Sequence, residues 1–406
     1  MRNKVIGLLV LTFSLSLLLT GCWDRLELND RAIILGWGMD LADDGTYMAT
    51  ANIVVPLASK TTGSQGEEPG GVTGFLTESA YGKDNLDATQ NMQRKLSRIL
   101  FPGHRRNIFI GEKLAEAGVA QVLDEYSRNP SVRPRTNIFV VKDATAQKAM
   151  SLSYQLESNP STAVQKIQEK IGAPISRSLL DFFMMVNGGS CGVMPALRVA
   201  PSESKNKKEK PTDNPPQTTL ELIGAAVFDQ QLKLAGYLGS EEFWVRLWLT
   251  GTLRKRDFTY PVGGPRETVT VSVNHFENKV IPQVKGNTVS FNVQLQGYGV
   301  VMENESGLDL SKPESLEQIQ REMSRHIQRQ VKKIVTKAQK ELKCDVFGFG
   351  DALHKRHPYH WKQMKSDWPQ LFLESDIDIE VKFKLTGTGT TGKSLVPDVA
   401  DGDHLL

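Results

Sequence analysis

Apolar and polar residues alternate along this chain with two different periods, one typical of strands and one typical of helices. Residues 33–41 and 47–55 form two β-prone apolar runs, and the sequence DDG at 43–45 between them predicts a hairpin turn. Residues 107–110 and 137–141 predict two further strands, each followed by a helical pattern. Strands that alternate with helices favour an α/β or α+β arrangement for the first half of the chain.

Four more segments complete the predicted first half. Helical spacing of apolar residues predicts a helix over 85–100, and a second apolar helix is predicted over 176–186. Residues 192–199 predict a last strand. Residues 59–79 are rich in Gly, Ser, Thr and Glu, a composition that predicts an exposed loop.

The second half begins with a predicted hairpin, formed by residues 220–228 and 232–238. A short helix is predicted to end at Gly251. Alternating apolar residues over 268–304 predict a meander of strands, and the same alternation over 375–385 predicts a final strand. The fold class expected for the whole chain is therefore mixed α+β, with mixed or antiparallel sheets and packed helices.

One long amphipathic helix is predicted between these strands. Residues 311–314 fit a capping box, and apolar residues then recur at steps of three and four from Leu316 to Leu342, about thirty residues in all. Residues 314–343 contain eight Lys or Arg and four Glu. This charge could contact lipid headgroups or an acidic partner. The regular apolar stripe favours the alternative, a helix packed on the core with a solvated polar face.

A segment rich in Pro and Lys, residues 201–217, divides the chain. It holds no large apolar residue, so we predict a flexible linker between an N-terminal α/β domain (22–200) and a C-terminal α+β region (218–390). The alternative is a long surface loop inside one domain. The C-terminal region can be divided further into 218–265 and 266–390, and a disordered tail is expected over 391–406.

The first residues read as a signal peptide. Arg2 and Lys4 precede an apolar run over residues 5–19, which is shorter than the roughly twenty residues that a membrane-spanning helix needs. We therefore predict that residues 1–21 are cleaved. The alternative is a short membrane anchor that the mature chain keeps.

Cys22 lies at the end of this apolar run, after Leu19, Thr20 and Gly21. An aliphatic residue, two small residues and a cysteine form the pattern of a bacterial lipobox. We predict that the chain is cleaved before Cys22 and that Cys22 carries S-diacylglycerol and an N-acyl group such as palmitate, because stable anchoring takes about two lipid chains. An ordinary buried or disulfide-bonded cysteine is the alternative at this position.

The net charge and the other candidate motifs limit the classes of function that the chain can have. The chain has a net charge of +3, and without Arg2 and Lys4 it has 47 basic and 46 acidic residues, which argues against a nucleic-acid-binding protein. Cys191 and Cys344 are treated as small buried residues, although an exported chain could pair them. No C-x-x-C pair occurs, and GWGMD at 36–40 lacks the third glycine of a dinucleotide-binding loop.

His354, His357 and His360 are the one candidate metal cluster. Pro358 interrupts the helix that would align them, and no acid or cysteine is placed to complete a site. A basic loop between two helical pieces is the favoured interpretation. No metal ligand, cofactor-binding residue or catalytic residue is therefore predicted, and the chain is not expected to be an enzyme.

Five stretches share their residues and their order with a known family: GCWDRLELNDRAIILGWGMD (21–40), LFPGHRRNIFIGEKLAEAG (100–118), RNPSVRP (128–134), GAAVFDQQLKLAGYL (224–238) and KAQKELKCDVFGFGDALHKRHPYHWKQMKSDW (337–368). In these stretches the chain resembles the Ger(x)C family, the C-subunit lipoproteins of nutrient germinant receptors in bacterial endospores. The similarity extends over nearly the whole mature chain.

The resemblance implies a function. A member of this family is a lipoprotein on the outer face of the spore inner membrane, in a complex with an A-type and a B-type integral membrane subunit. The resemblance transfers a role to Cys22 alone, and it leaves contact with the germinant itself open. The alternative function is a lipid-anchored solute-binding protein of a transporter, which would show two similar lobes. A membrane-anchored hydrolase has little support.

Overall fold

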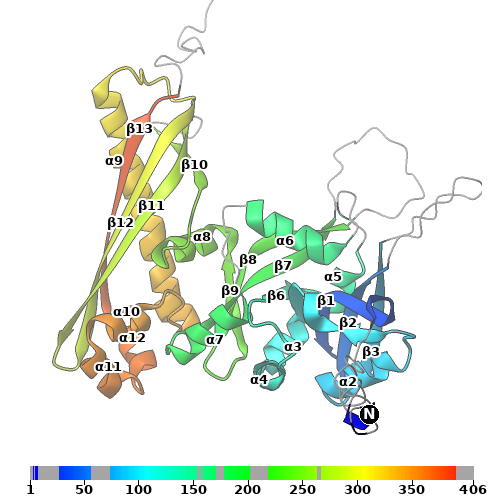
Figure 1. Ribbon diagram of the computed structural model, residues 1–406. Coiled ribbons are helices and arrows are strands. Elements are labelled where there is room, and N and C mark those ends of the chain that lie inside the picture. Colours follow the sequence, from blue (N-terminus) through cyan, green and yellow to red (C-terminus); the bar gives the residue numbers. More distant parts are fainter. Residues whose placement is uncertain are drawn as a thin grey trace, which may run out of the picture.

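The computed structural model describes residues 3, 5–7, 27–55, 74–152, 157, 159–170, 178–201, 218–262 and 267–389. Two separate sheets and a set of helices make up these residues (Figure 1). The first sheet has nine strands and the second has four. This arrangement confirms the predicted mixed α+β fold class.

The first sheet is parallel in its centre and antiparallel toward both edges. Its strand order is β3-β2-β1-β5-β6-β7-β8-β9, and the short β4 pairs with β1. Strands β1, β5, β6 and β7 run parallel to one another, and the first helices connect them. The strands are β1 (Arg31–Leu41), β2 (Tyr47–Val54), β3 (Phe75–Gly82), β4 (Ile99–Phe101), β5 (Asn107–Gly111), β6 (Asn137–Lys142), β7 (Gly192–Pro201), β8 (Thr218–Phe228) and β9 (Leu234–Gly239).

Helices cover both faces of the first sheet, because neighbouring residues of its central strands point to opposite sides. Ile108, Ile110 and Ile138 pack against α2, α3, α4 and α7. Phe109 and Phe139 pack against α5 and α6 on the other face. The helices are η1 (Leu28–Asp30), α2 (Asn85–Gln93), η2 (Pro102–His104), α3 (Glu112–Ala117), α4 (Ala120–Arg128), α5 (Ala146–Met150), α6 (Pro160–Lys170) and α7 (Leu179–Asn187).

The second sheet is built on one long hairpin. Strands β11 and β12 pair along almost their whole lengths and turn at Gly286, whose φ of 57° favours glycine. Its order is β10-β11-β12-β13, with β13 parallel to β12. The strands are β10 (Arg256–Pro261), β11 (Thr268–Lys285), β12 (Thr288–Asn304) and β13 (Asp376–Gly387).

The long helix α9 packs along the second sheet (Figure 1). Its apolar stripe, which includes Ile319, Met323, Ile327 and Val331, is buried in the core, so the predicted core-packed helix is confirmed. The helices of this half are α8 (Ser240–Leu249), α9 (Pro313–Lys337), η3 (Ala338–Leu342), α10 (Phe349–Arg356), α11 (Pro358–Met364) and α12 (Trp368–Glu374).

Two predictions near the first edge of the sheet were wrong. Residues 75–79 belong to strand β3, where polar side chains are tolerated because β3 is the outermost strand and pairs only with β2. The helix predicted over 85–100 ends at Gln93. The Gln93 side chain donates to the Arg98 carbonyl and accepts the Leu100 N–H, which fixes the chain as it turns back into β4.

The predicted capping box of α9 was also wrong. Lys312 is the N-cap residue and makes no side-chain cap hydrogen bond. The Ser311 hydroxyl instead donates to the Asp309 carboxylate at 2.6 Å, which also accepts the Ser311 N–H. Pro313 begins the helix, where its missing N–H costs no hydrogen bond.

The predicted linker joins two neighbouring strands. Strand β7 ends at Pro201, β8 begins at Thr218, and the two pair antiparallel; residues 202–217 lie outside the described part of the chain. The chain changes from the first sheet to the second later, through α8, between Gly239 and Arg256. Neither 201–217 nor 265/266 therefore coincides with the change of sheet, and the domain division itself stays a prediction.

Candidate functional site

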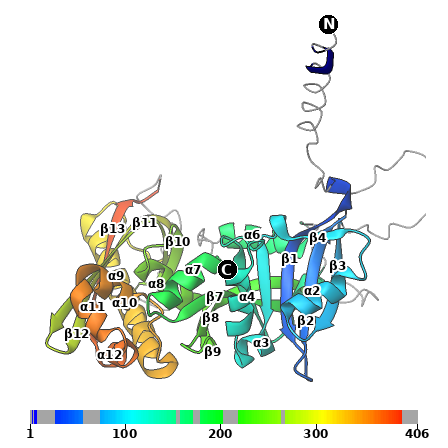
Figure 2. The same ribbon diagram turned by 60° about the horizontal axis from the view of Figure 1, so that its bottom comes forward.

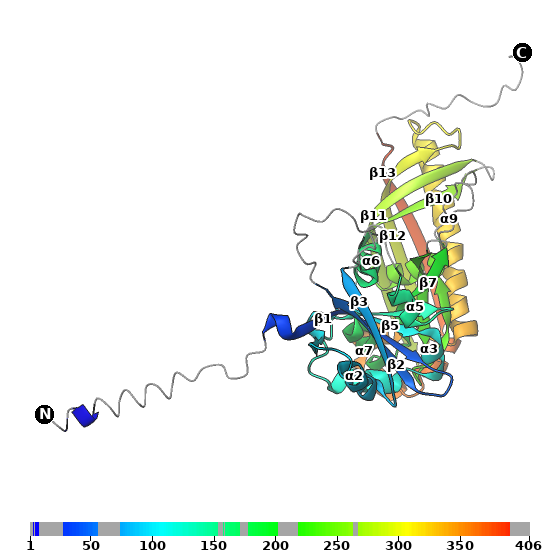
Figure 3. The same cartoon turned by 90° about the vertical axis from the view of Figure 1, so that its right-hand side faces the viewer.

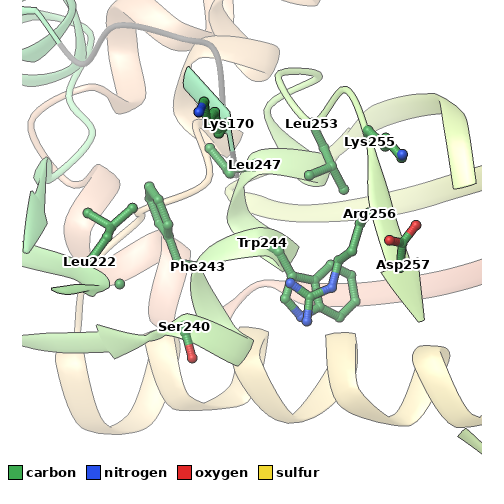
Figure 4. Close-up of a pocket in the computed structure, with 11 residues that line it drawn as sticks. Lys170, Leu222, Ser240, Phe243, Trp244, Leu247, Leu253, Lys255, Arg256 and Asp257 are labelled. Carbon is green, nitrogen blue, oxygen red and sulfur yellow. The ribbon is translucent and has the colours of Figure 1, made fainter. Parts of the chain in front are cut away.

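A cavity of about 440 Å³ lies beside α8, where the first sheet meets the second (Figure 4). Helix α8 supplies most of the apolar floor through Phe243, Trp244 and Leu247, which are all buried. Leu222 of β8 and Leu253, in the turn before β10, complete it. The cavity therefore draws its walls from elements of both sheets.

The rim of this cavity is cationic, with Arg256 held in place. The Arg256 guanidinium donates to both carboxylate oxygens of Glu241, at 2.8 and 2.9 Å, and lies 4.9 Å from the centre of the Trp244 ring. Figure 4 shows the Arg256 and Trp244 side chains overlapping. Lys170 and Lys255 are exposed on the same rim, and Asp257 is its acidic member.

An apolar floor below a cationic rim suits a small molecule that carries both an apolar part and a negative charge. The cavity is therefore a candidate site for binding such a molecule. Sequence reasoning missed this site because its residues come from four separate elements, α6, β8, α8 and β10, which only the folded chain brings around one cavity. No local spacing pattern connects them.

A second junction between the sheets is covalent. Cys191, just before β7, forms a disulfide with Cys344, just after η3, across 153 residues of sequence. The sequence left this pairing open. The Cys191 N–H also donates to the Asp345 carbonyl at 3.0 Å, so a main-chain hydrogen bond supports the same junction.

Asp345 fixes the start of α10 next to this disulfide. Its buried carboxylate accepts N–H groups from Phe347, Gly348, Phe349 and Gly350 at 2.8–3.2 Å. The Trp368 indole N–H donates to it as well. Burial raises the pKa of the Asp345 carboxyl above its usual value, while these backbone hydrogen bonds act to lower it.

Cys22, the one residue with a predicted covalent role, lies outside the described residues, as do its neighbours at 8–21 and 23–26. Within the described part of the chain, no helix is both long enough and apolar enough to cross a bilayer.

The three histidines lie on two short helices. The His354 ring on α10 stacks on Trp361, with ring centroids 5.8 Å apart. His357, between α10 and α11, and His360, on α11, pack with their rings edge to face. Across the described ranges, no three His, Cys, Asp or Glu side chains gather closely enough to hold a metal ion. These histidines are therefore not brought together with a further ligand.

Two stretches that the predictions did not include match catalytic patterns by spacing alone. GGSCG at 188–192 has the spacing of a hydrolase nucleophile turn, which joins a strand to a helix. Here the stretch joins helix α7 to strand β7, and its Cys191 is in the disulfide, so the context is wrong. GTGTTGKS at 387–394 has the spacing of a phosphate-binding loop, but residues from 390 onward lie outside the described part.

Comparison with protein families gives two matches in sequence order. Residues 24–199 match the family described as spore germination protein N-terminal domain. Residues 223–389 match the family described as spore germination B3/GerAC like, C-terminal. Together the two matches cover most of the chain, and the residues between them include the predicted linker.

Individual relatives agree with this result. The chain is 26% identical to spore germination protein KC of Bacillus subtilis (strain 168), over 92% of this chain and 93% of that protein. It is 22% identical to spore germination protein B3 of the same organism, over 94% and 97%. The fold is similar to the crystal structure of the GerBC protein, with a TM-score of 0.57 and 20% identity, over 86% of this chain and 97% of that one. The chain belongs to the Ger(x)C family of spore germination proteins.

Proposed function

We propose that this chain is the lipid-anchored C-type subunit of a nutrient germinant receptor of bacterial spores, and that it acts by binding and signalling, without catalysis. The observation that carries the proposal is the match of two germination-protein families, in order, over residues 24–199 and 223–389. The relatives named spore germination proteins match along nearly their whole lengths, which supports a role in germination for the entire chain.

The proposed location follows from the first residues. Residues 1–21 have the pattern of a cleaved signal peptide, and Cys22 has the pattern of a lipidated N-terminus. We place the mature chain on the outer face of the spore inner membrane, with an A-type and a B-type integral membrane subunit as its partners. By binding such subunits, a chain held only by lipid would be coupled to proteins that span the bilayer.

A solute-binding protein of a transporter is the less favoured function. Such a protein would show two similar lobes. In this chain the nine-stranded sheet is parallel in its centre and covered by helices on both faces, whereas the four-stranded sheet is built on a long antiparallel hairpin. The two parts are therefore dissimilar in topology.

Membrane fractionation of sporulating cells tests the proposed anchor. The wild-type chain in the membrane fraction should incorporate a labelled fatty acid, and Cys22→Ala should incorporate none, because the lipid has no other attachment point in the proposal. Thr20→Ala is the matched control, since it keeps a small residue beside the cleavage point, and should stay in the membrane fraction. A Cys22→Ala chain that still carries the labelled fatty acid would contradict the anchor.

A further inference from the structure

One tip of the first sheet gathers exposed aliphatic side chains. Leu28, Val55, Leu76 and Ile99 are 70, 38, 43 and 48% exposed, respectively. Leucine, isoleucine and valine scattered singly over a surface need no explanation, but a group of them marks an interaction site. The question is therefore whether these four residues belong to the same place.

Strand pairing places them at one end of the sheet, on its two faces. Arg31 at the start of β1 pairs with Ile99 of β4, and Leu28 lies three residues before it. On the other side of β1, Ile34 pairs with Ile53 of β2, and Ile53 pairs with Leu76 of β3. Val55 directly follows β2 and so lies at the same end. We call Leu28, Val55, Leu76 and Ile99 the aliphatic tip.

The tip is also where the chain arrives from Cys22. In Figure 2 the beginnings of β1 and β4 lie at the same end of the sheet, and in Figure 3 η1 projects from the body at the start of β1. Leu28 is six residues after Cys22. An extended chain spans at most about 3.5 Å per residue, so Leu28 lies within about 20 Å of the Cys22 Cα.

We propose that the aliphatic tip is a second membrane contact, at which Leu28, Val55, Leu76 and Ile99 enter the lipid interface beside the anchor. This inference rests on the proposed lipidation of Cys22, because the short chain then holds the tip next to the bilayer. Burying aliphatic side chains in the acyl boundary strengthens the attachment of a lipidated protein. The exposed Arg98 beside Ile99 is placed to meet a lipid phosphate.

Such a contact would fix the orientation of the protein as well as its distance from the bilayer. A single flexible anchor leaves a protein free to tumble over the bilayer. A second contact at the tip restricts that tumbling and presents a defined face of the first sheet to partners in the membrane.

Site-directed fluorescence tests whether the aliphatic tip enters the lipid interface. With Cys22 lipidated and Cys191 and Cys344 joined, an introduced cysteine is the one free thiol of the mature chain. Leu28→Cys and Ile99→Cys would each be labelled with a fluorophore, and the lipidated protein reconstituted in phosphatidylcholine vesicles with or without bromine on the acyl chains. Met302→Cys is the matched control, because Met302 is about as exposed as Leu28, at 68%, but lies on β12 of the second sheet.

The expected result is that brominated lipid quenches the fluorophore at Leu28→Cys and Ile99→Cys by at least about twofold, with no change at Met302→Cys. Two results, in protein that floats with the vesicles, would contradict the membrane contact at the tip: equal quenching at all three positions, or quenching at none. Both results would leave the lipid anchor intact. Quenching at none of the three positions would leave a protein partner in the membrane as the alternative occupant of the tip. Protein that does not float with the vesicles would overturn both the anchor and the tip.

Discussion

At the scale of single residues, Asp345 connects two helices of the C-terminal half to the segment before β7 of the first sheet. Its carboxylate accepts backbone N–H groups at the start of α10 and the indole N–H of Trp368 on α12, while its carbonyl accepts the Cys191 N–H. A carboxylate can accept hydrogen bonds at both oxygens, whereas an amide accepts at one and donates at the other. The substitution Asp345→Asn, which exchanges one oxygen for an NH2 group, therefore tests whether both oxygens are needed as acceptors.

We expect Asp345→Asn to lower the free energy of unfolding by about 2–4 kcal/mol, because the new NH2 group would face N–H donors and leave at least one of them unpaired. Urea denaturation measures this change. Asp351→Asn is the matched control: Asp351 forms a surface ion pair with Lys355, and its loss should cost less than about 1 kcal/mol. Equal effects of the two substitutions would contradict the role given to Asp345.

Asp40 gives a prediction about pH. Burial raises the pKa of its carboxyl above 3.8. The hydrogen bonds that it accepts from the N–H groups of Gln147 and Ala146 act to lower this pKa, but burial has the larger effect. The folded chain therefore holds this proton more tightly than the unfolded chain does. The contribution of Asp40 to the free energy of unfolding falls as pH rises from about 4 through the folded-state pKa.

Urea midpoints of wild type and Asp40→Asn, measured across this pH range, check the expectation. The difference between wild type and variant should change in favour of the variant as pH rises, because the amide that replaces the carboxyl has no proton to lose. A constant difference between wild type and Asp40→Asn at all pH values would contradict the raised pKa.

At the scale of elements, α9 shows what the apolar stripe contributes. Ile327 is 3% exposed against the second sheet, whereas Arg325 lies two residues away on the exposed face. Deleting most of a buried isoleucine leaves a cavity that costs about 2–5 kcal/mol. We expect Ile327→Ala to destabilise the chain by this amount, measured by thermal or urea unfolding.

Arg325→Ala is the matched control and should change stability by less than about 0.5 kcal/mol. The same pair of variants separates the two interpretations of α9. If the basic face bound lipid, Arg325→Ala would weaken membrane attachment while Ile327→Ala would not. The account predicts no effect of Arg325→Ala on attachment.

The elements that the sequence predicted are those whose residues carry the pattern themselves. The period of α9, the buried runs of β5 and β6, and the DDG turn between β1 and β2 all appear in the structure. The missed elements depend on distant partners. Strand β3 exists because β2 lies beside it, and α2 stops at Gln93 because the Gln93 side chain binds the returning chain.

The candidate sites also divide into one that local sequence reveals and others that depend on distant residues. Cys22 is recognised from its neighbours in sequence. The cavity beside α8, the Cys191–Cys344 pair and the aliphatic tip each join residues that only the folded chain brings together, so no spacing rule reveals them.

At the scale of the whole molecule, the two sheets are joined covalently and by one core. Strands β7, β8 and β9 of the first sheet share a cluster of buried residues with α8 and the second sheet. The half-buried ion pair of Lys337 on α9 with Glu242 on α8, at 2.7 Å, and the Cys191–Cys344 disulfide add to this junction. Both sheets are thereby tied together by a shared core, an ion pair and a disulfide.

We expect the double variant Cys191→Ala and Cys344→Ala to lower the free energy of unfolding by about 2–4 kcal/mol, since the disulfide closes a loop across 153 residues. Differential scanning calorimetry would show a lower Tm. A reducing agent should produce a similar shift in the wild-type chain and none in the variant. An unchanged Tm in the variant would show that the core alone holds the sheets together.

The most direct test of the central claim is the identity of the proteins that bind this chain in the membrane. The tagged, lipidated chain would be purified from detergent-solubilised spore inner membranes, and the proteins that copurify would be identified by mass spectrometry. We expect one A-type and one B-type germinant receptor subunit. Recovery of a transport permease in the absence of both subunits would contradict it.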